Sequence, residues 1–125
     1  MPLNHINLVV SDVAAATKLF ENYFNFMCTD VKGSNIVVVL KDTNDFTLVL
    51  MADKNGKAVY PDAFHVGFMQ ESTDVVIEIY KRLKKGGIAV GKEPGKIRDS
   101  FGFYFTFDTL MIEVGHYDNL SRTTA

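Results

Sequence analysis

Residues 63–69 read AFHVGFM, a short run in which large apolar side chains alternate with other residues. This alternation predicts a β-strand, and a polar break at 70–72 followed by apolar residues at helical spacing predicts a helix after it. The N-terminal stretch LNHINLVV, residues 3–10, repeats the plan, with a histidine near its start and a polar break before a helical pattern. His65 lies 60 residues after His5, about half of the 125-residue chain. The sequence therefore indicates an internal duplication.

The composition is that of a globular protein. Hydrophobic residues make up 47% of the chain, including ten Phe and five Tyr, and 125 residues suffice for a single domain with a sizeable core. The net charge of −2 gives no electrostatic reason to expect a nucleic-acid partner. The apolar runs are too short for a membrane span, and no secretory signal opens the chain. A single cysteine, Cys28, excludes an internal disulfide, so we expect a cytoplasmic protein.

The first half continues as one predicted helix and three predicted strands. The helix begins at Val13, where the preceding Ser11 and Asp12 supply a capping oxygen, and ends near Asn25. Strands are expected at 27–31, 35–40 and 46–51, with turns at 33–34 and 42–45. Residues 53–62, with Gly56 and Pro61, are typical of a linker.

The second half repeats this order. A helix with its apolar stripe from Val75 to Leu83 should stop at Gly86 and Gly87. Strands are expected at 88–92, 100–107 and 110–115, with a loop at 93–99 and a tight turn at 108–109. The chain is thus predicted to hold one module at about 1–52, a linker at about 53–62, a second module at about 63–117, and a tail at 118–125.

Two such modules resemble the vicinal oxygen chelate superfamily, which includes glyoxalases, bleomycin-resistance proteins and extradiol dioxygenases. The stretches that carry the resemblance are LNHINLVVSD at 3–12, FHVGF at 64–68 and MIEV at 111–114. The resemblance covers about residues 2–117, and the order and spacing of these stretches carry most of its weight. It implies an α+β fold in which two βαβββ modules form a cupped, half-open barrel, all within one domain of residues 1–125.

The resemblance also implies a metal centre made by His5, His65 and Glu113, which take inward positions on the first or last strand of a module. Two neutral imidazoles and one carboxylate leave coordination positions open for a substrate. Such a mixed set suits Fe, Mn, Zn, Ni or Co better than calcium. The alternative is that these three are polar strand residues and a surface glutamate without a metal.

The fourth ligand position of glyoxalase I is missing. Pairing 46–51 with 110–115 puts Val49 at the place equivalent to Glu113, and valine cannot bind a metal. Asp53 lies past the strand, in the expected linker. The pattern is therefore more similar to members with three ligands, such as extradiol dioxygenases and fosfomycin thiol transferases. The tight turn at 108–109 departs from the Asp-Pro-x-Gly that is common in the superfamily.

Several further side chains are expected beside the metal. The candidate substrate contacts share a mostly apolar, methionine-rich face, and they are Asn7, Val49, Met51, Gly67, Met69 and Tyr104. The alternative for these residues is that they only fill a core. His116 and Tyr117 are candidates for a nearby acid or base, although a histidine at such a strand end is more often a surface residue. Arg98 and Ser100 are, like Tyr104, candidates for polar contacts, and Arg122 lies in a tail that could fold over the cup.

Two functions from different classes remain open. One is a small metalloenzyme that acts on an oxygen-chelating substrate as a lyase, a thiol transferase or a dioxygenase. The other is a metal-free protein of the bleomycin-resistance type, which sequesters a flat aromatic compound between two subunits. In both cases we expect a homodimer and a small-molecule ligand, with no nucleic-acid or membrane partner.

Overall fold

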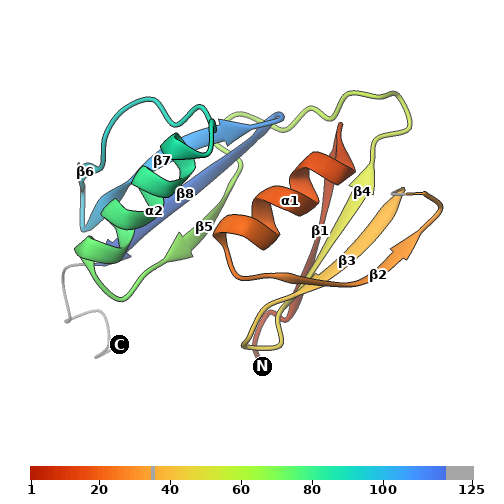
Figure 1. Ribbon diagram of the computed structural model, residues 1–125, viewed down its shortest axis with the longest axis horizontal. Coiled ribbons are helices and arrows are strands. Elements are labelled where there is room, and N and C mark those ends of the chain that lie inside the picture. Colours follow the sequence, from red (N-terminus) through yellow and green to blue (C-terminus); the bar gives the residue numbers. More distant parts are fainter. Residues whose placement is uncertain (35, 118–125) are drawn as a thin grey trace. The chain divides into compact units, whose positions relative to one another are not determined.

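The structure, a computed structural model, describes residues 1–34 and 36–117 (Figure 1). The chain divides into two compact units, Met1–Tyr60 and Pro61–Ala125. Asn35 of the expected strand at 35–40 lies outside the described residues, and so does the expected tail at 118–125 with Arg122.

The first unit contains one helix and a four-stranded sheet. Its elements are β1 (His5–Val10), α1 (Val13–Tyr23), β2 (Met27–Lys32), β3 (Val37–Lys41) and β4 (Thr47–Ala52). The strands lie in the order β1-β4-β3-β2, with β1 parallel to β4 and the other pairs antiparallel.

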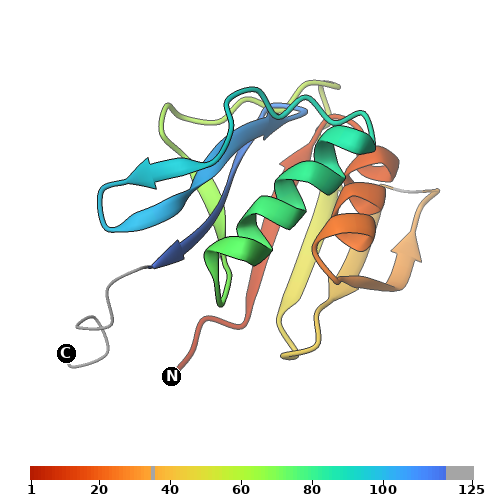
Figure 2. The ribbon, with the colours of Figure 1, turned by 60° about the vertical axis from the view of Figure 1, so that its left-hand side comes forward.

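The second unit has the same topology. Its elements are β5 (His65–Met69), α2 (Thr73–Lys85), β6 (Gly95–Ile97), β7 (Ser100–Phe107) and β8 (Leu110–Tyr117). The strand order is β5-β8-β7-β6, and β5 is parallel to β8. Each helix packs on one face of its own sheet (Figure 1 and Figure 2). The predicted α+β fold of two βαβββ modules is confirmed.

Both helices begin and end where the sequence predicts. The Asp12 carboxylate and the Ser72 hydroxyl each accept a hydrogen bond from the backbone N–H three residues later. After α1 the chain turns through Asn25 at φ 61°, and after α2 through Gly87 at φ 85°. Neither helix is long and apolar enough to cross a membrane.

Each sheet buries the face that its helix covers. In the first unit the side chains below α1 include those of Leu8, Val10, Leu48 and Leu50. In the second, those below α2 include Phe103, Phe105, Ile112 and Val114. Burying one such side chain stabilises the fold by about 1.5–3 kcal/mol. Because strand residues alternate between faces, His5, His65 and Glu113 lie on the faces away from the helices.

The prediction for residues 88–99 is wrong. Residues 88–92 are not a strand, because hydrogen bonds tie them to α2: the Ile88 N–H donates to the Leu83 carbonyl at 3.0 Å, and the Tyr80 hydroxyl donates to the Gly91 carbonyl at 2.7 Å. The third strand of the module is instead β6, inside the predicted loop at 93–99, and it pairs with the start of β7. Of the apolar run at 88–90, only Val90 is buried, and the run does not join the sheet.

The expected linker is ordered against the first unit up to Tyr60. Ala58 is only 4% exposed, and its N–H donates to the Ser11 hydroxyl at 3.1 Å. The Tyr60 hydroxyl donates to the Val9 carbonyl. Asp53 accepts a hydrogen bond from the Lys57 N–H at 2.9 Å, which closes a turn. These contacts explain why the boundary between the units falls at Pro61 and not at the end of β4.

Candidate functional site

His65 and Glu113 meet on the open face of the second sheet. Their strands, β5 and β8, are parallel neighbours, and the register puts Met111 beside His65 and Glu113 beside Gly67. The His65 Nε2 atom lies 3.3 Å from the Glu113 Oε1 atom. The side chain of His65 is 36% exposed and that of Glu113 is 15% exposed. The predicted ligands of this unit are therefore adjacent and only partly accessible to solvent.

The backbone fixes the tautomer of His65. Its Nδ1 lies 2.9 Å from the Ala63 carbonyl oxygen, which can only accept, so Nδ1 carries the hydrogen. In the neutral imidazole Nε2 then has a free lone pair, and this lone pair faces the Glu113 carboxylate. Two electron-rich atoms at 3.3 Å need a cation between them, either a proton on Nε2 or a metal ion. The donor set thus fits a divalent metal.

Gly67 leaves space beside the carboxylate. A Cβ atom at this position would lie 3.4 Å from Glu113 Oε1, in ordinary van der Waals contact with the oxygen that faces His65. The predicted contact residue Met69 lies on the same face of β5 and is 37% exposed. On the β5 side, the neighbours of the pair are thus a glycine and a methionine.

Tyr104 contacts both members of the pair. It lies directly opposite Glu113 on β7 and hydrogen-bonds to that side chain. Its ring meets the His65 ring edge to face, with centroids 5.4 Å apart and an interplanar angle of 77°. The sequence predicts Tyr104 only as a substrate contact. Counting outward from the two-residue turn at 108–109 would have placed it opposite Glu113.

The environment of Tyr104 favours its protonated form. Burial raises the pKa of the phenol, and the Glu113 carboxylate raises this pKa further by its charge and by accepting a hydrogen bond. The Arg98 guanidinium acts in the opposite direction on the pKa but is a smaller effect. At neutral pH the hydroxyl is therefore a hydrogen-bond donor to the carboxylate.

A pocket of about 190 Å³ opens beside the pair. It is lined by the turn at 97–100 together with Tyr104, Glu113 and Tyr117. Glu113 and the exposed Arg98 both line it. A ligand in this pocket would touch the candidate metal ligand Glu113 and a cationic side chain.

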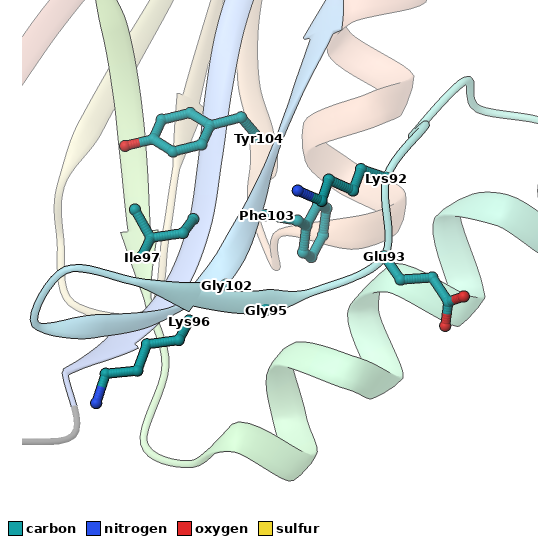
Figure 3. A pocket seen from close by; sticks show the side chains of 8 residues that line it. All are labelled: Lys92, Glu93, Gly95, Lys96, Ile97, Gly102, Phe103 and Tyr104. Carbon is teal, nitrogen blue, oxygen red and sulfur yellow. The ribbon is translucent and has the colours of Figure 1, made fainter.

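A second pocket of about 220 Å³ lies along β6 and shares Tyr104 (Figure 3). It also includes Lys92, Glu93, Ile97 and Phe103. In Figure 3 the side chains of Ile97 and Tyr104 lie on one side of the two strands, and Lys96 points away from them.

His5 occupies the equivalent position in the first unit. It is exposed, and its Nδ1 lies 2.7 Å from Asn4 Oδ1. The register pairs His5 with Thr47 and Asn7 with Val49, as His65 pairs with Met111 and Gly67 with Glu113. Val49 therefore takes the place of Glu113 in the first module, as the sequence indicates.

The other predicted contacts of this unit share the face of His5. Asn7 donates a side-chain hydrogen bond to the Met51 sulfur at 2.9 Å, and Val49 lies between Thr47 and Met51 on β4. The open face of this sheet has no carboxylate at the position of Glu113.

The structure brings two of the three predicted metal ligands together. His65 and Glu113 lie in the second unit, whereas His5 belongs to the first. Within residues 1–34 and 36–117, no three His, Cys, Asp or Glu side chains form a group that could hold a metal ion.

His116 is not near the pair. It lies three residues after Glu113 on β8, so its side chain projects from the opposite face of the strand. Its Nδ1 is 2.9 Å from the Gln70 carbonyl oxygen. The idea that His116 is a nearby acid or base is therefore wrong, because strand alternation turns it away. Tyr117, the other candidate, does line the pocket beside Glu113.

Comparison with known proteins identifies the family of the chain. The family model described as Glyoxalase/Bleomycin resistance protein/Dioxygenase superfamily matches residues 2–114. A solved structure of a possible glyoxalase from Bacillus cereus is 40% identical, with a TM-score of 0.79 over 91% of this chain and 97% of that one. The search of curated proteins gave no match.

Two more distant structures share the fold. The fosfomycin resistance protein FosX from Listeria monocytogenes is 21% identical, with a TM-score of 0.76 over 97% of this chain and 96% of that one. Lactoylglutathione lyase from Agrobacterium tumefaciens is 16% identical, with a TM-score of 0.72 over 92% of each chain. The chain belongs to the Glyoxalase/Bleomycin resistance protein/Dioxygenase superfamily. Members of this superfamily bind small molecules and commonly use divalent metals.

Proposed function

We propose that this protein is a metalloenzyme in which His65 and Glu113 hold a divalent ion. The observation that carries the proposal is the 3.3 Å approach of the His65 Nε2 lone pair to the Glu113 carboxylate, with Nδ1 tied to the Ala63 carbonyl. Protein ligands of metals are commonly oriented by such a hydrogen bond on the other ring nitrogen. The Tyr104 hydroxyl supports the carboxylate in the same way.

His5 is the proposed third protein ligand. It takes the same position as His65 in the duplicated module, and its Nδ1 is likewise engaged, by Asn4 at 2.7 Å. This contact leaves Nε2 free to bind a metal. Two imidazoles and one carboxylate suit Fe, Mn, Zn, Ni or Co. We propose that the protein works as a cytoplasmic homodimer, with His5 supplied by the same chain or by the second copy.

The bound ion would chelate neighbouring oxygens of a small substrate and stabilise negative charge that develops on them. The chain's own residues orient the reactants around it. Tyr104 holds the Glu113 carboxylate in place and keeps a proton beside it, and Gly67 leaves room at that oxygen. The proposed substrate contacts are Asn7, Val49, Met51, Gly67, Met69 and Tyr104.

The reaction is proposed to be a lyase, thiol-transfer or dioxygenase step on such a substrate. The names of the relatives, lactoylglutathione lyase and fosfomycin resistance protein, are compatible with this range. The competing function is a metal-free binding protein of the bleomycin-resistance type, which would use the open apolar faces but would not need His65 beside Glu113.

Metal analysis tests the proposal. Protein purified without a polyhistidine tag should carry close to one divalent ion per chain. His65→Ala and Glu113→Gln should each lower retained metal at least about tenfold, because each removes one ligand. His116→Ala is the matched control, since this histidine is on the opposite face of β8. If both ligand variants retain metal as the parent does, or if the parent carries none after reloading, the binding-protein function replaces the enzyme.

A further inference from the structure

Arg98 occupies an unfavourable backbone position. It is in the two-residue turn between β6 and β7, where Ile97 pairs with Ser100, and its φ is 50°. Positive φ in such turns favours Gly, Asn or Asp. The next hairpin of the chain follows this preference, with Asp108 at φ 61°. An arginine at this position is therefore not explained by the turn.

The Arg98 guanidinium is available to a ligand. It lines the pocket of about 190 Å³ beside Glu113, and it is close enough to Tyr104 to act on the phenol electrostatically. Within residues 1–34 and 36–117, Arg98 takes part in no ion pair. Asp99 follows it in the turn and lines the same pocket. Among the described residues, the pocket thus has a cationic side chain that forms no ion pair, and this side chain shares the pocket with the candidate metal ligand Glu113.

We propose that Arg98 makes this pocket a subsite for a carboxylate of the substrate, an inference that rests on the proposed metal function. The guanidinium is planar and can donate two parallel hydrogen bonds to a carboxylate. The substrate class is then a small acid whose further oxygens, on the carbon next to the carboxylate, reach the His65–Glu113 pair. A pocket of about 190 Å³ accommodates a group of this size.

The charges of the pocket predict a linkage between acid and metal. Glu113 and Asp99 both line the pocket. Their negative charges repel a carboxylate as long as no cation is bound to Glu113. A divalent ion on Glu113 removes this repulsion, so metal and acid should each raise the affinity for the other by the same factor. Glu113→Gln should remove the repulsion without a metal.

The experiment is a titration of the protein with glycolate, the smallest 2-hydroxy acid, in which binding is measured by two-dimensional NMR or by calorimetry. Zinc-loaded protein should bind glycolate more tightly than it binds the neutral isostere glycolamide. Arg98→Gln and Arg98→Gly should weaken glycolate binding about 10- to 100-fold, as expected for loss of a charge-assisted hydrogen bond. Arg98→Gly also relieves the positive φ, so its fold should be intact. Lys96→Gln is the control, because it removes the same charge from a side chain that points away from Tyr104 in Figure 3.

The outcomes separate this inference from the metal function. If zinc-loaded protein binds glycolate equally well with and without Arg98, or no better than glycolamide, the subsite does not exist although the metal does. If neither the parent protein nor the Arg98 variants retain zinc, the metal function fails. The subsite is then tested in Glu113→Gln protein without metal. There, glycolate binding that is lost in the Arg98→Gln/Glu113→Gln double variant supports the subsite, and absence of binding overturns it.

Discussion

Tyr104 contacts both candidate metal ligands of the second unit, His65 and Glu113, with its one side chain. It hydrogen-bonds to Glu113 from the neighbouring strand, and its ring packs against the His65 ring with the two ring centroids 5.4 Å apart. A carboxylate held by a phenol has less freedom to leave the position that faces His65 Nε2. Tyr104 thereby positions a ligand without being one itself.

Replacing Tyr104 with Phe should weaken metal binding about fivefold. The ring and its packing remain, and only the hydrogen bond to the carboxylate is lost, which is typically a change of about 1 kcal/mol. Calorimetric titration with Zn²⁺ or Mn²⁺ measures the effect, and the melting temperature reports on the fold. Tyr117→Phe is the comparison, since Tyr117 lines the same pocket but is not opposite Glu113. Equal affinities of parent and Tyr104→Phe would contradict the positioning role.

The raised pKa of Tyr104 has a defined effect on stability in the metal-free protein. A group whose pKa is higher in the folded state stabilises the fold below its unfolded pKa, near 10. This contribution is lost as the pH rises through the folded pKa. The ionisation of Tyr104 can be followed as the difference in absorbance near 295 nm between the parent and Tyr104→Phe as the pH is raised. This titration should have its midpoint above pH 10. A midpoint below 10 would mean that Arg98 outweighs burial and Glu113.

For single residues, the sequence predicts the sheet face on which a side chain lies better than it predicts which other side chains it contacts. The duplication is enough to put His5, His65 and Glu113 on open sheet faces, because strand alternation follows from the apolar pattern. The contact of Tyr104 with Glu113 depends on the register of β7 and β8, which the apolar pattern alone does not give. The odd spacing of His116 from Glu113 is enough to put its side chain on the other face of the strand.

The β7–β8 hairpin is the element that holds Tyr104 opposite Glu113. Its strands approach very closely at Gly102, where a Cβ atom would lie 2.2 Å from the Val114 carbonyl oxygen. Gly102 pairs with Gly115, so neither strand has a side chain at this point. The two glycines allow the register that builds the site.

Gly102→Ala should therefore destabilise the protein by at least about 2 kcal/mol, because the backbone has to move to accept the methyl group. Gly95→Ala is the matched control: Gly95 pairs with Gly102 from β6, and a Cβ there meets nothing within 4 Å. Chemical denaturation measures both variants. An equal loss of stability in the two variants would contradict the close approach of the strands at Gly102.

The short strand β6 shows why element prediction failed at one place. Residues 88–92 have the apolar composition of a strand, but the hydrogen bonds of Ile88 and Gly91 bind this segment to α2. β6 contains only Gly95, Lys96 and Ile97, too few residues for a periodic signal. The other strands and both helices could be predicted because each carries a clear period and clear end signals.

For the whole molecule, the repeated topology leaves each sheet with one face that its own helix does not cover. Exposed apolar side chains on these faces include Val9 in the first unit, and Met69 and Tyr104 in the second. Exposed apolar surface of this kind is typical of ligand or subunit contacts. We therefore expect light scattering on the purified protein to give about twice the chain mass of 14.0 kDa. A mass of a single chain at micromolar concentration would contradict the proposed homodimer.

X-ray absorption at the metal edge tests the metal centre most directly. In untagged, metal-loaded protein we predict nitrogen and oxygen neighbours at about 2.0–2.2 Å and the outer-shell scattering of two imidazoles. His5→Ala and His65→Ala should each remove one imidazole from the spectrum, and His116→Ala should remove none. A spectrum without imidazole scattering, or one that the His65→Ala substitution leaves unchanged, would contradict the account.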